Sequence, residues 1–268
     1  MLKLSMAYSP CPNDTFMFHD VAAGDWSRAG YDVTVHLHDI ETLNRMALDG
    51  VYDITKVSFH AYLRVRAEYQ LLNAGAALGF GCGPLLVARR PLDPAELPRC
   101  RVAVPGELTT AHLLLRLWAP DIRQKLFVTY DQVLDLVRTG EVDCGLLIHE
   151  SRFVYRDAGL SCVVDLGQWW ETQTGQPIPL GCVVARKRFG VPVLAELERL
   201  LQAAIRHSRA CPAGTAGYVR EHAREKDASV QRQHIDMFVT DFSLDLGESG
   251  RAAVAALETM ARQARVIE

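Results

Sequence analysis

The sequence predicts an α/β protein whose two lobes enclose a ligand cleft. Short apolar strands alternate with helices in the first third of the chain, and the same alternation restarts after residue 100. Two Pro-containing stretches, at 89–98 and 175–179, are expected to cross between the lobes. Each run of alternating elements is too short to be the whole protein. A hinged two-lobe fold therefore fits the pattern better than a single doubly wound sheet.

The first run predicts three strands, each followed by a helix. Apolar residues alternate with polar or small ones at the start of the chain, which is the pattern of a half-buried strand. Asn13 or Asp14 is suited to cap the first helix, Asp39 the second and Ser58 the third. The expected strands span 2–8, 33–37 and 53–57, and the expected helices span 13–24, 39–50 and 58–68.

The second run repeats this order and leads into a helical C-terminal part. Thr109 is placed to cap a leucine-rich helix, and Gly140 to end the next one. Strands are expected at 101–104, 127–130, 142–148, 162–166 and 180–185, and helices with breaks near Cys211 and Gly247 follow from about residue 192. The first lobe is expected to recruit these helices. This gives a discontinuous lobe 1 of residues 1–88 and 180–268, and a lobe 2 of residues 89–179.

Composition and charge exclude several classes of function. The 268 residues carry a net charge of −3, which gives no basic footprint for nucleic acid or an anionic membrane. Seven cysteines, without any Cys-x-x-Cys pair, argue against a structural zinc site or a disulfide framework. The uncharged stretch 69–88 is too rich in glycine for a membrane span, and there is no room for a secretory segment before Ser9. We therefore expect a reduced, soluble, cytoplasmic protein.

Polar residues gather where the predicted strands end, which is where open α/β sheets bind their ligands. Lys56 and Ser58 follow one strand of the first lobe, and Thr109 and Thr110 open a helix of the second. Helix N-termini favour anions, and Lys56 adds a positive charge, so we expect a small carboxylate ligand. Ser58, Thr109 and Thr110 are also explained as ordinary helix caps, and Asn13 as a turn residue.

His149 is the sharpest catalytic candidate, because it ends an apolar strand at the expected cleft. A neutral imidazole is a suitable general base near pH 7. No second His or carboxylate lies at metal-ligand spacing from it, so we expect no metal there. Glu150 and Arg152 pair with each other or orient His149, and the sequence does not decide between these roles. Trp169 either walls the cleft against a flat ligand or belongs to the core, together with Trp170.

Several strings of the sequence are specific enough to indicate a family. They are Ser9-Pro-Cys-Pro-Asn-Asp-Thr-Phe16, Asp39-Ile-Glu-Thr-Leu-Asn44, Thr55-Lys-Val-Ser58, Val104-Pro-Gly106 with Thr109-Thr110, Ile148-His-Glu-Ser-Arg-Phe153, and Asp165-Leu-Gly-Gln-Trp-Trp-Glu171 followed by Pro177-Ile-Pro-Leu-Gly181. Together they resemble the 1,4-dihydroxy-6-naphthoate synthase family, which acts in the futalosine route to menaquinone. The resemblance runs from about residue 9 to 181 and is weaker, though compatible, through the C-terminal helices.

The resemblance implies a fold similar to the type 2 periplasmic binding proteins. It also implies a lyase that converts cyclic dehypoxanthine futalosine into 1,4-dihydroxy-6-naphthoate and releases a three-carbon sugar fragment, dihydroxyacetone. His149 matches the family's proposed proton acceptor, and Lys56-Val57-Ser58 with Thr109-Thr110 match its substrate contacts. Asn13, Asn44, Glu150, Arg152 and Trp169 are further cleft candidates. The resemblance calls for no metal, nucleotide or redox cofactor.

Two other functions stay open. One is the sister enzyme of the same pathway, which dehydrates a chorismate derivative on a similar fold. The other is a protein that captures a small acid without converting it. The Ile148-His-Glu-Ser-Arg string fits the naphthoate synthase better, and a substrate test separates the three.

Overall fold

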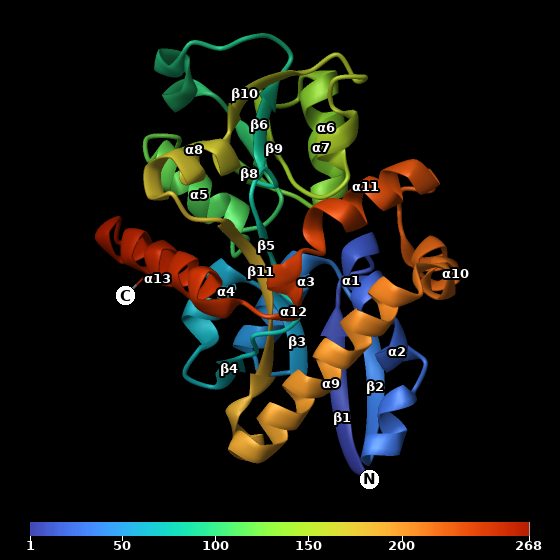
Figure 1. Cartoon of the computed structure of the whole chain (residues 1–268). Coiled ribbons are helices and arrows are strands. Elements are labelled where there is room, and N and C mark those ends of the chain that lie inside the picture. Colours follow the sequence, from blue (N-terminus) through green and yellow to red (C-terminus); the bar gives the residue numbers. More distant parts are fainter. Residues whose placement is uncertain (268) are drawn as a thin grey trace.

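Two β-sheets, each covered by helices, form the two lobes of the protein (Figure 1). The computed structural model describes residues 1–267. The expected two-lobe α/β architecture is confirmed. One lobe, lower in Figure 1, holds both the start of the chain and most of the C-terminal helices. The other lobe is built from the middle of the chain.

The first sheet is mixed, with both parallel and antiparallel pairs of strands. Its order is β2-β1-β3-β11-β4, and β5 also pairs with β11. The strands are β1 (Leu2–Tyr8), β2 (Tyr31–Leu37), β3 (Ile54–Ser58), β4 (Tyr69–Leu71), β5 (Ala77–Gly79) and β11 (Ile178–Arg186). β1 is parallel to β2 and β3, as the alternation of strands and helices predicts. The late strand β11 enters antiparallel beside β3, because it returns to this sheet from the other lobe.

The second sheet has the order β10-β6-β9-β7-β8. Its strands are β6 (Leu85–Ala88), β7 (Val102–Val104), β8 (Lys125–Phe127), β9 (Cys144–Leu147) and β10 (Ser161–Asp165). The boundary expected after residue 88 needs correction, because β6 pairs with β9 and β10 and not with the first sheet. The chain leaves the first sheet after β5, so residues 80–84 make the first crossing. The Pro-rich stretch at 89–98 lies after that crossing.

The helices largely begin where the sequence indicates. They are α1 (Pro12–Met17), α2 (His19–Ala22), α3 (Ile40–Leu48), α4 (Phe59–Val65), α5 (Thr110–Trp118), α6 (Tyr130–Thr139), α7 (Ser151–Val154), α8 (Leu166–Thr174), α9 (Gly190–Ala210), α10 (Pro212–His222), α11 (Ala228–Phe238), α12 (Asp241–Leu244) and α13 (Gly247–Gln263). The Asp39 carboxylate accepts from the N–H groups of Glu41 and Thr42, as an N-cap does, and the Thr109 hydroxyl accepts from His112 N.

Other details of the expected helices are wrong. The single helix expected over 13–24 is broken at Phe18 into α1 and α2. Cys11, rather than Asn13 or Asp14, is its N-cap residue, because the Asp14 carboxylate is turned toward Ser9 and Lys56 instead. The strand expected at 127–130 ends at Phe127, and residue 130 already begins α6.

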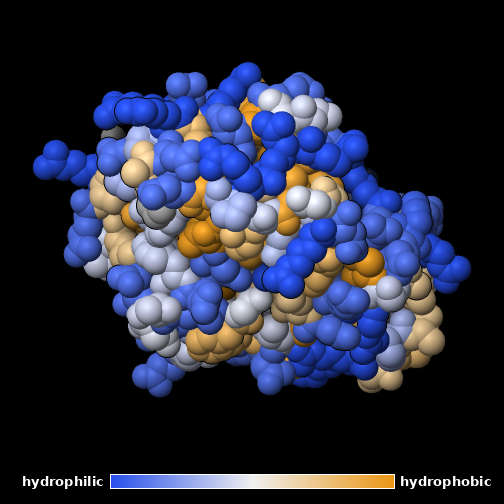
Figure 2. Space-filling view, turned by 90° about the horizontal axis from the view of Figure 1, so that it is seen from above, coloured by the Kyte–Doolittle hydropathy of each residue, from blue (hydrophilic) through white to orange (hydrophobic). Residues whose placement is uncertain are grey.

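The C-terminal helices pack against both lobes. α9, α10 and α11 pack on α1 in the first lobe, whereas α13 contacts both β11 and α5. One cluster of buried apolar residues runs from Val57 on β3 to Leu86 on β6 and Leu257 on α13. No helix within residues 1–267 is long and apolar enough to cross a bilayer. On the face seen in Figure 2, hydrophilic side chains surround smaller apolar groups.

Candidate active site

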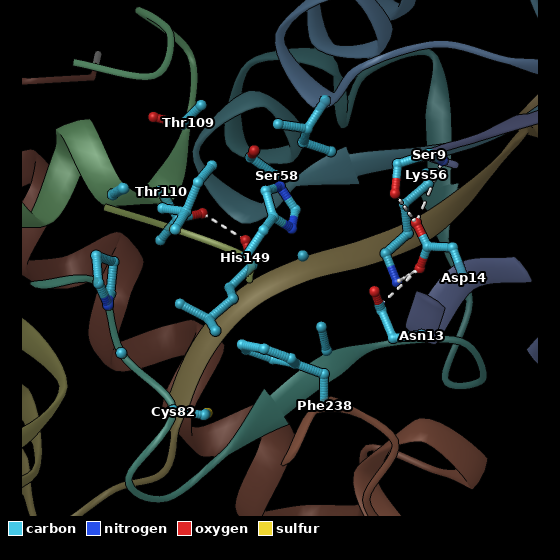
Figure 3. A pocket seen from close by; sticks show the side chains of 18 of the residues that line it. Ser9, Asn13, Asp14, Lys56, Ser58, Cys82, Thr109, Thr110, His149 and Phe238 are labelled. Atoms are coloured by element: carbon cyan, nitrogen blue, oxygen red, sulfur yellow. Dashed lines mark hydrogen bonds and ion pairs between the residues drawn. The ribbon is translucent and has the colours of Figure 1, made fainter. Parts of the chain in front are cut away.

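A pocket of about 670 Å³, including its open mouth, lies between the two lobes. Its walls come from the strand ends of both sheets and from α11 (Figure 3). Apolar side chains form much of the lining, among them Ile148, Leu180 and Phe238. The pocket thus occupies the place expected for the cleft.

Lys56 reaches this pocket but does not supply the free positive charge that the sequence predicts. Its Nζ lies 3.0 Å from Asp14 Oδ1 and donates to the carbonyl oxygen of Gly75 at 2.6 Å. Asp14 also accepts from the Ser9 hydroxyl and from the Asn13 amide. The lysine and aspartate side chains are both almost fully buried. This ion pair neutralises Lys56 and forms a rigid polar corner of the pocket (Figure 3).

Ser58 is the pocket hydroxyl with a proton free for a ligand. Its Oγ accepts a hydrogen bond from Asn44 Nδ2 at 3.0 Å, while Asn44 Oδ1 accepts from Ser58 N. Asn44 is fully buried behind it and holds it in place. Because the oxygen is the acceptor in the bond with Asn44, the hydroxyl hydrogen can still donate. Val57, the residue before, points away into the core.

Thr109 and Thr110 line the pocket, but their hydroxyls are already engaged. Thr109 Oγ1 donates to the Gly106 carbonyl oxygen, and Thr110 Oγ1 donates to that of Leu180 on β11. The second bond joins α5 of one lobe to the return strand of the other. The N–H groups of Thr110 and Ala111, at the first positions of α5, have no acceptor within the helix. The backbone rather than the hydroxyls is therefore available to an anion here.

His149 projects its ring into the pocket from the second lobe (Figure 3). It stands between β9 and α7 with φ at +56°, a left-handed conformation uncommon for a residue with a side chain. Its Nδ1 lies 3.4 Å from Cys11 Sγ, and its Nε2 is buried without a hydrogen-bond partner among the described residues. Burial lowers the pKa of the imidazole to about 4, so the ring is neutral at pH 7.

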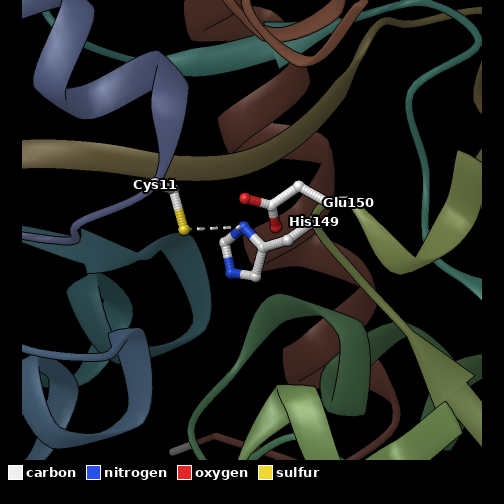
Figure 4. Close-up of side chains that lie close together, drawn as sticks. All are labelled: Cys11, His149 and Glu150. Atoms are coloured by element: carbon white, nitrogen blue, oxygen red, sulfur yellow. Dashed lines mark hydrogen bonds between the residues drawn. The ribbon is translucent and has the colours of Figure 1, made fainter. Parts of the chain in front are cut away.

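Three buried groups stand close behind His149. Cys11 lies on one side, and burial raises the pKa of its thiol, so the sulfur keeps its proton at neutral pH. Glu150 lies beside the ring (Figure 4). His234, from α11, stacks almost parallel to His149 with ring centroids 6.0 Å apart and donates from Nε2 to Asn13 Oδ1. Sequence reasoning missed His234, because a histidine on a distant helix has no local pattern that marks it.

The remaining candidates are divided between the pocket and the core. Arg152 lines the pocket; its guanidinium lies 3.9 Å from Asp165 and 3.1 Å from the sulfur of Met237. Trp169 is half-buried and packs against the core outside the pocket lining. Trp170 is fully buried, with Nε1 donating to the Pro177 carbonyl oxygen. Of the two expectations for the tryptophan pair, the core position is the one seen.

Comparison with known proteins agrees with this architecture. The sequence matches a family described as menaquinone biosynthesis over residues 4–263. A 1,4-dihydroxy-6-naphthoate synthase of Thermus thermophilus is 46% identical over 96% of this chain and 93% of its own length. A protein of the same name from Streptomyces coelicolor is 44% identical, over 96% of this chain and 92% of its own. The chain belongs to the menaquinone biosynthesis family. It is thus an enzyme of that biosynthesis, and the resemblance seen in its sequence motifs is confirmed.

Solved structures place the fold among the periplasmic-binding-protein-like proteins. A protein from Archaeoglobus fulgidus, 35% identical, superposes with a TM-score of 0.92 over 99% of this chain and 98% of its own. An alkanesulfonate-binding protein from Xanthomonas axonopodis superposes with a TM-score of 0.72 at 13% identity, over 100% and 95% of the two chains. The second likeness is one of fold alone.

Proposed function

We propose that this enzyme is a carbon–carbon lyase that converts cyclic dehypoxanthine futalosine into 1,4-dihydroxy-6-naphthoate and releases dihydroxyacetone, with His149 as general base. The observation that carries the proposal is the neutral His149 imidazole, whose Nε2 has no partner within residues 1–267 and whose ring faces the pocket. The names of the two relatives that match most of the chain support the reaction. Such a biosynthetic step belongs in the cytoplasm.

Substrate binding follows from the groups that are still free. The Ser58 hydroxyl and the first N–H groups of α5 would hold the carboxylate, which favours a helix N-terminus. Arg152 adds a positive charge that is only loosely paired with Asp165. The apolar walls around Leu180 and Phe238 suit a flat ring system. Closure of the two lobes over this ligand would exclude water.

Proton transfer then depends on the tautomer of His149. When Nδ1 carries the proton and donates a hydrogen bond to Cys11 Sγ, Nε2 presents a lone pair to the substrate. Nε2 would take a proton from a substrate carbon. The electron pair left behind would enter the ring system of the substrate as the bonds to the sugar-derived fragment break. Formation of the aromatic naphthalene helps to drive this step.

The test is turnover without added cofactor. Purified protein is incubated with cyclic dehypoxanthine futalosine, and 1,4-dihydroxy-6-naphthoate is followed by mass. His149→Ala should lower turnover by about 10²–10⁴-fold, the usual contribution of a general base, while binding is largely kept. His207→Ala, an exposed histidine away from the pocket, is the matched control and should keep full turnover.

Three other outcomes would contradict the role of His149 or the proposed reaction. Full turnover by His149→Ala would remove His149 from the role of base. Conversion of a chorismate derivative instead would indicate the sister enzyme of the pathway. Tight binding of an aromatic acid with no product from either substrate would indicate a capture protein.

A further inference from the structure

Cys11, His149 and Glu150 bring three metal-ligating groups of different kinds together at the lobe interface (Figure 4). Cys11 follows β1 of the first lobe, whereas His149 and Glu150 follow β9 of the second. One sulfur, one ring nitrogen and one carboxylate oxygen lie within 4.8 Å of one another. Because Cys11 is 138 residues away along the chain, the spacing of the sequence could not reveal this cluster.

We propose that this cluster binds a thiophilic divalent cation such as Zn²⁺ through Cys11 Sγ, His149 Nδ1 and a Glu150 carboxylate oxygen, and that the bound cation inhibits the enzyme. Sulfur, imidazole and carboxylate are the ligands that Zn²⁺ prefers. Tetrahedral zinc with ordinary bond lengths separates a sulfur and a nitrogen ligand by about 3.6 Å. The Sγ–Nδ1 distance here is 3.4 Å, so these two atoms are already spaced as ligands.

The surroundings of Glu150 supply an independent reason to expect a cation. Glu150 is only 7% exposed, and its Oε1 has no hydrogen-bond partner in the described part of the chain. Its Oε2 lies 4.0 Å from His234 Nδ1. Because His234 donates from Nε2 to Asn13, its Nδ1 carries a lone pair in the neutral ring. The buried Glu150 carboxyl group thus has an oxygen without a partner and gains no hydrogen bond from His234, and a cation bound to Glu150 would supply the partner that this oxygen lacks.

Inhibition follows from the tautomer that the metal imposes, and this part rests on the proposed function. A cation on Nδ1 uses the lone pair of that nitrogen, so the proton of the neutral ring moves to Nε2. Nε2 then has no lone pair for the substrate, and the base is blocked. The Cys11 thiol loses its proton to solvent when its sulfur binds the metal. No oxidation or reduction is involved.

The experiment measures binding separately from activity. Because Cys162 and Cys211 are exposed thiols, the test uses the full chain with Cys162→Ser and Cys211→Ser as background. Calorimetry should find one Zn²⁺ per chain, and Co²⁺ should give the absorption of a thiolate–cobalt bond. Adding Cys11→Ser should abolish that absorption and weaken Zn²⁺ binding at least about tenfold, a cost seen even for outer-shell partners. Glu150→Gln should also weaken binding.

Activity gives the second readout. Turnover of the background protein should fall as Zn²⁺ fills this site, with half-inhibition near the calorimetric dissociation constant. Cys11→Ser, compared with its own zinc-free rate, should need at least about tenfold more Zn²⁺. Unchanged binding in Cys11→Ser, or no thiolate–cobalt absorption in the background protein, would overturn the proposal. Turnover without zinc binding refutes this inference alone, and zinc binding without turnover of the proposed substrate refutes the proposed function alone.

Discussion

Burial sets the protonation state of the residue at the centre of the pocket. Burial leaves the half-buried His149 ring little solvent to stabilise an imidazolium, which is the main reason for its lowered pKa; the nearby positive charge of Lys56 acts in the same direction. Asp14 opposes the shift but is itself paired with Lys56. A neutral ring is the form that accepts a proton, so the apolar pocket keeps the proposed base ready at neutral pH.

The pH profile of kcat/KM should report this shift. The base is active when deprotonated, so the rate should fall as pH drops through about 4, the pKa of His149, and should stay flat above it on account of this group. With an ordinary solvated histidine, the acid limb of the profile, where the rate falls, would lie near pH 6.5. A limb at 6.5 would therefore show that the ring is hydrated in the free enzyme. Circular dichroism at each pH separates this effect from unfolding.

Loss of either partner of the buried Asp14–Lys56 ion pair should destabilise the first lobe. Asp14→Asn leaves the Lys56 ammonium buried without its counter-charge and should lower the free energy of unfolding by about 3–5 kcal/mol. Urea unfolding of both proteins measures this. Glu196→Gln, which breaks the exposed pair with Arg199, is the control and should leave the free energy of unfolding almost unchanged, because solvent screens an exposed pair. Equal losses would mean that water reaches the buried pair.

At the scale of elements, the crossing between the lobes depends on a close backbone contact. Gly83, just before β6, packs against Gly167 at the start of α8, and a Cβ on Gly83 would stand 2.2 Å from the Gly167 Cα. Gly83→Ala should therefore cost about 1–3 kcal/mol through backbone displacement. Gly217→Ala is the matched control, because open space surrounds Gly217 in α10. There alanine should gain about 0.5–1 kcal/mol. Thermal unfolding measures both; a neutral Gly83→Ala would contradict the close packing.

Local sequence patterns predict elements better than they predict how those elements pair. The alternation of apolar and polar residues locates β1, and helix-capping residues locate α3 and the start of α5. These signals are carried by neighbouring residues in the sequence. The sheet to which β6 belongs depends on partners at 144–147 and 161–165, which no local pattern records. The same limit explains the tryptophan pair, since Trp170 is buried by contacts from distant segments.

The candidate site was predictable to the same extent. Ser58, Thr109, Thr110 and His149 all reach the pocket, as expected from their positions at strand ends. Their hydrogen-bond partners decide which of them are free, and those partners, such as Asn44 and Leu180, are distant in sequence. The neutralised charge of Lys56 is the clearest example, because Asp14 lies 42 positions earlier.

At the scale of the whole molecule, one apolar core continues through both lobes. The return strand β11 and the last helix α13 join the two sheets around the pocket. Histidines are buried along this junction: His60 on α4 and His112 on α5 each have an Nε2 without a partner in residues 1–267. Burial lowers the pKa of His60 to about 3 and that of His112 to about 4. The junction therefore contains imidazoles that must stay neutral while the protein is folded.

Acid should consequently destabilise the fold well above the range in which its carboxylates titrate. A histidine whose pKa is lowered on folding binds more protons when unfolded, so its stabilising contribution is complete above about 6.5 and is lost as pH falls toward its folded value. For His112 the loss between pH 7 and pH 5 is about 2 kcal/mol. His112→Asn keeps a donor for the Glu107 carbonyl oxygen, which His112 Nδ1 contacts at 2.7 Å, but does not titrate. Urea unfolding at the two pH values should show a pH-dependent loss smaller by about 2 kcal/mol in the variant than in the parent. Equal losses in both would mean that His112 is protonated in the folded protein, and that the junction between the lobes admits water.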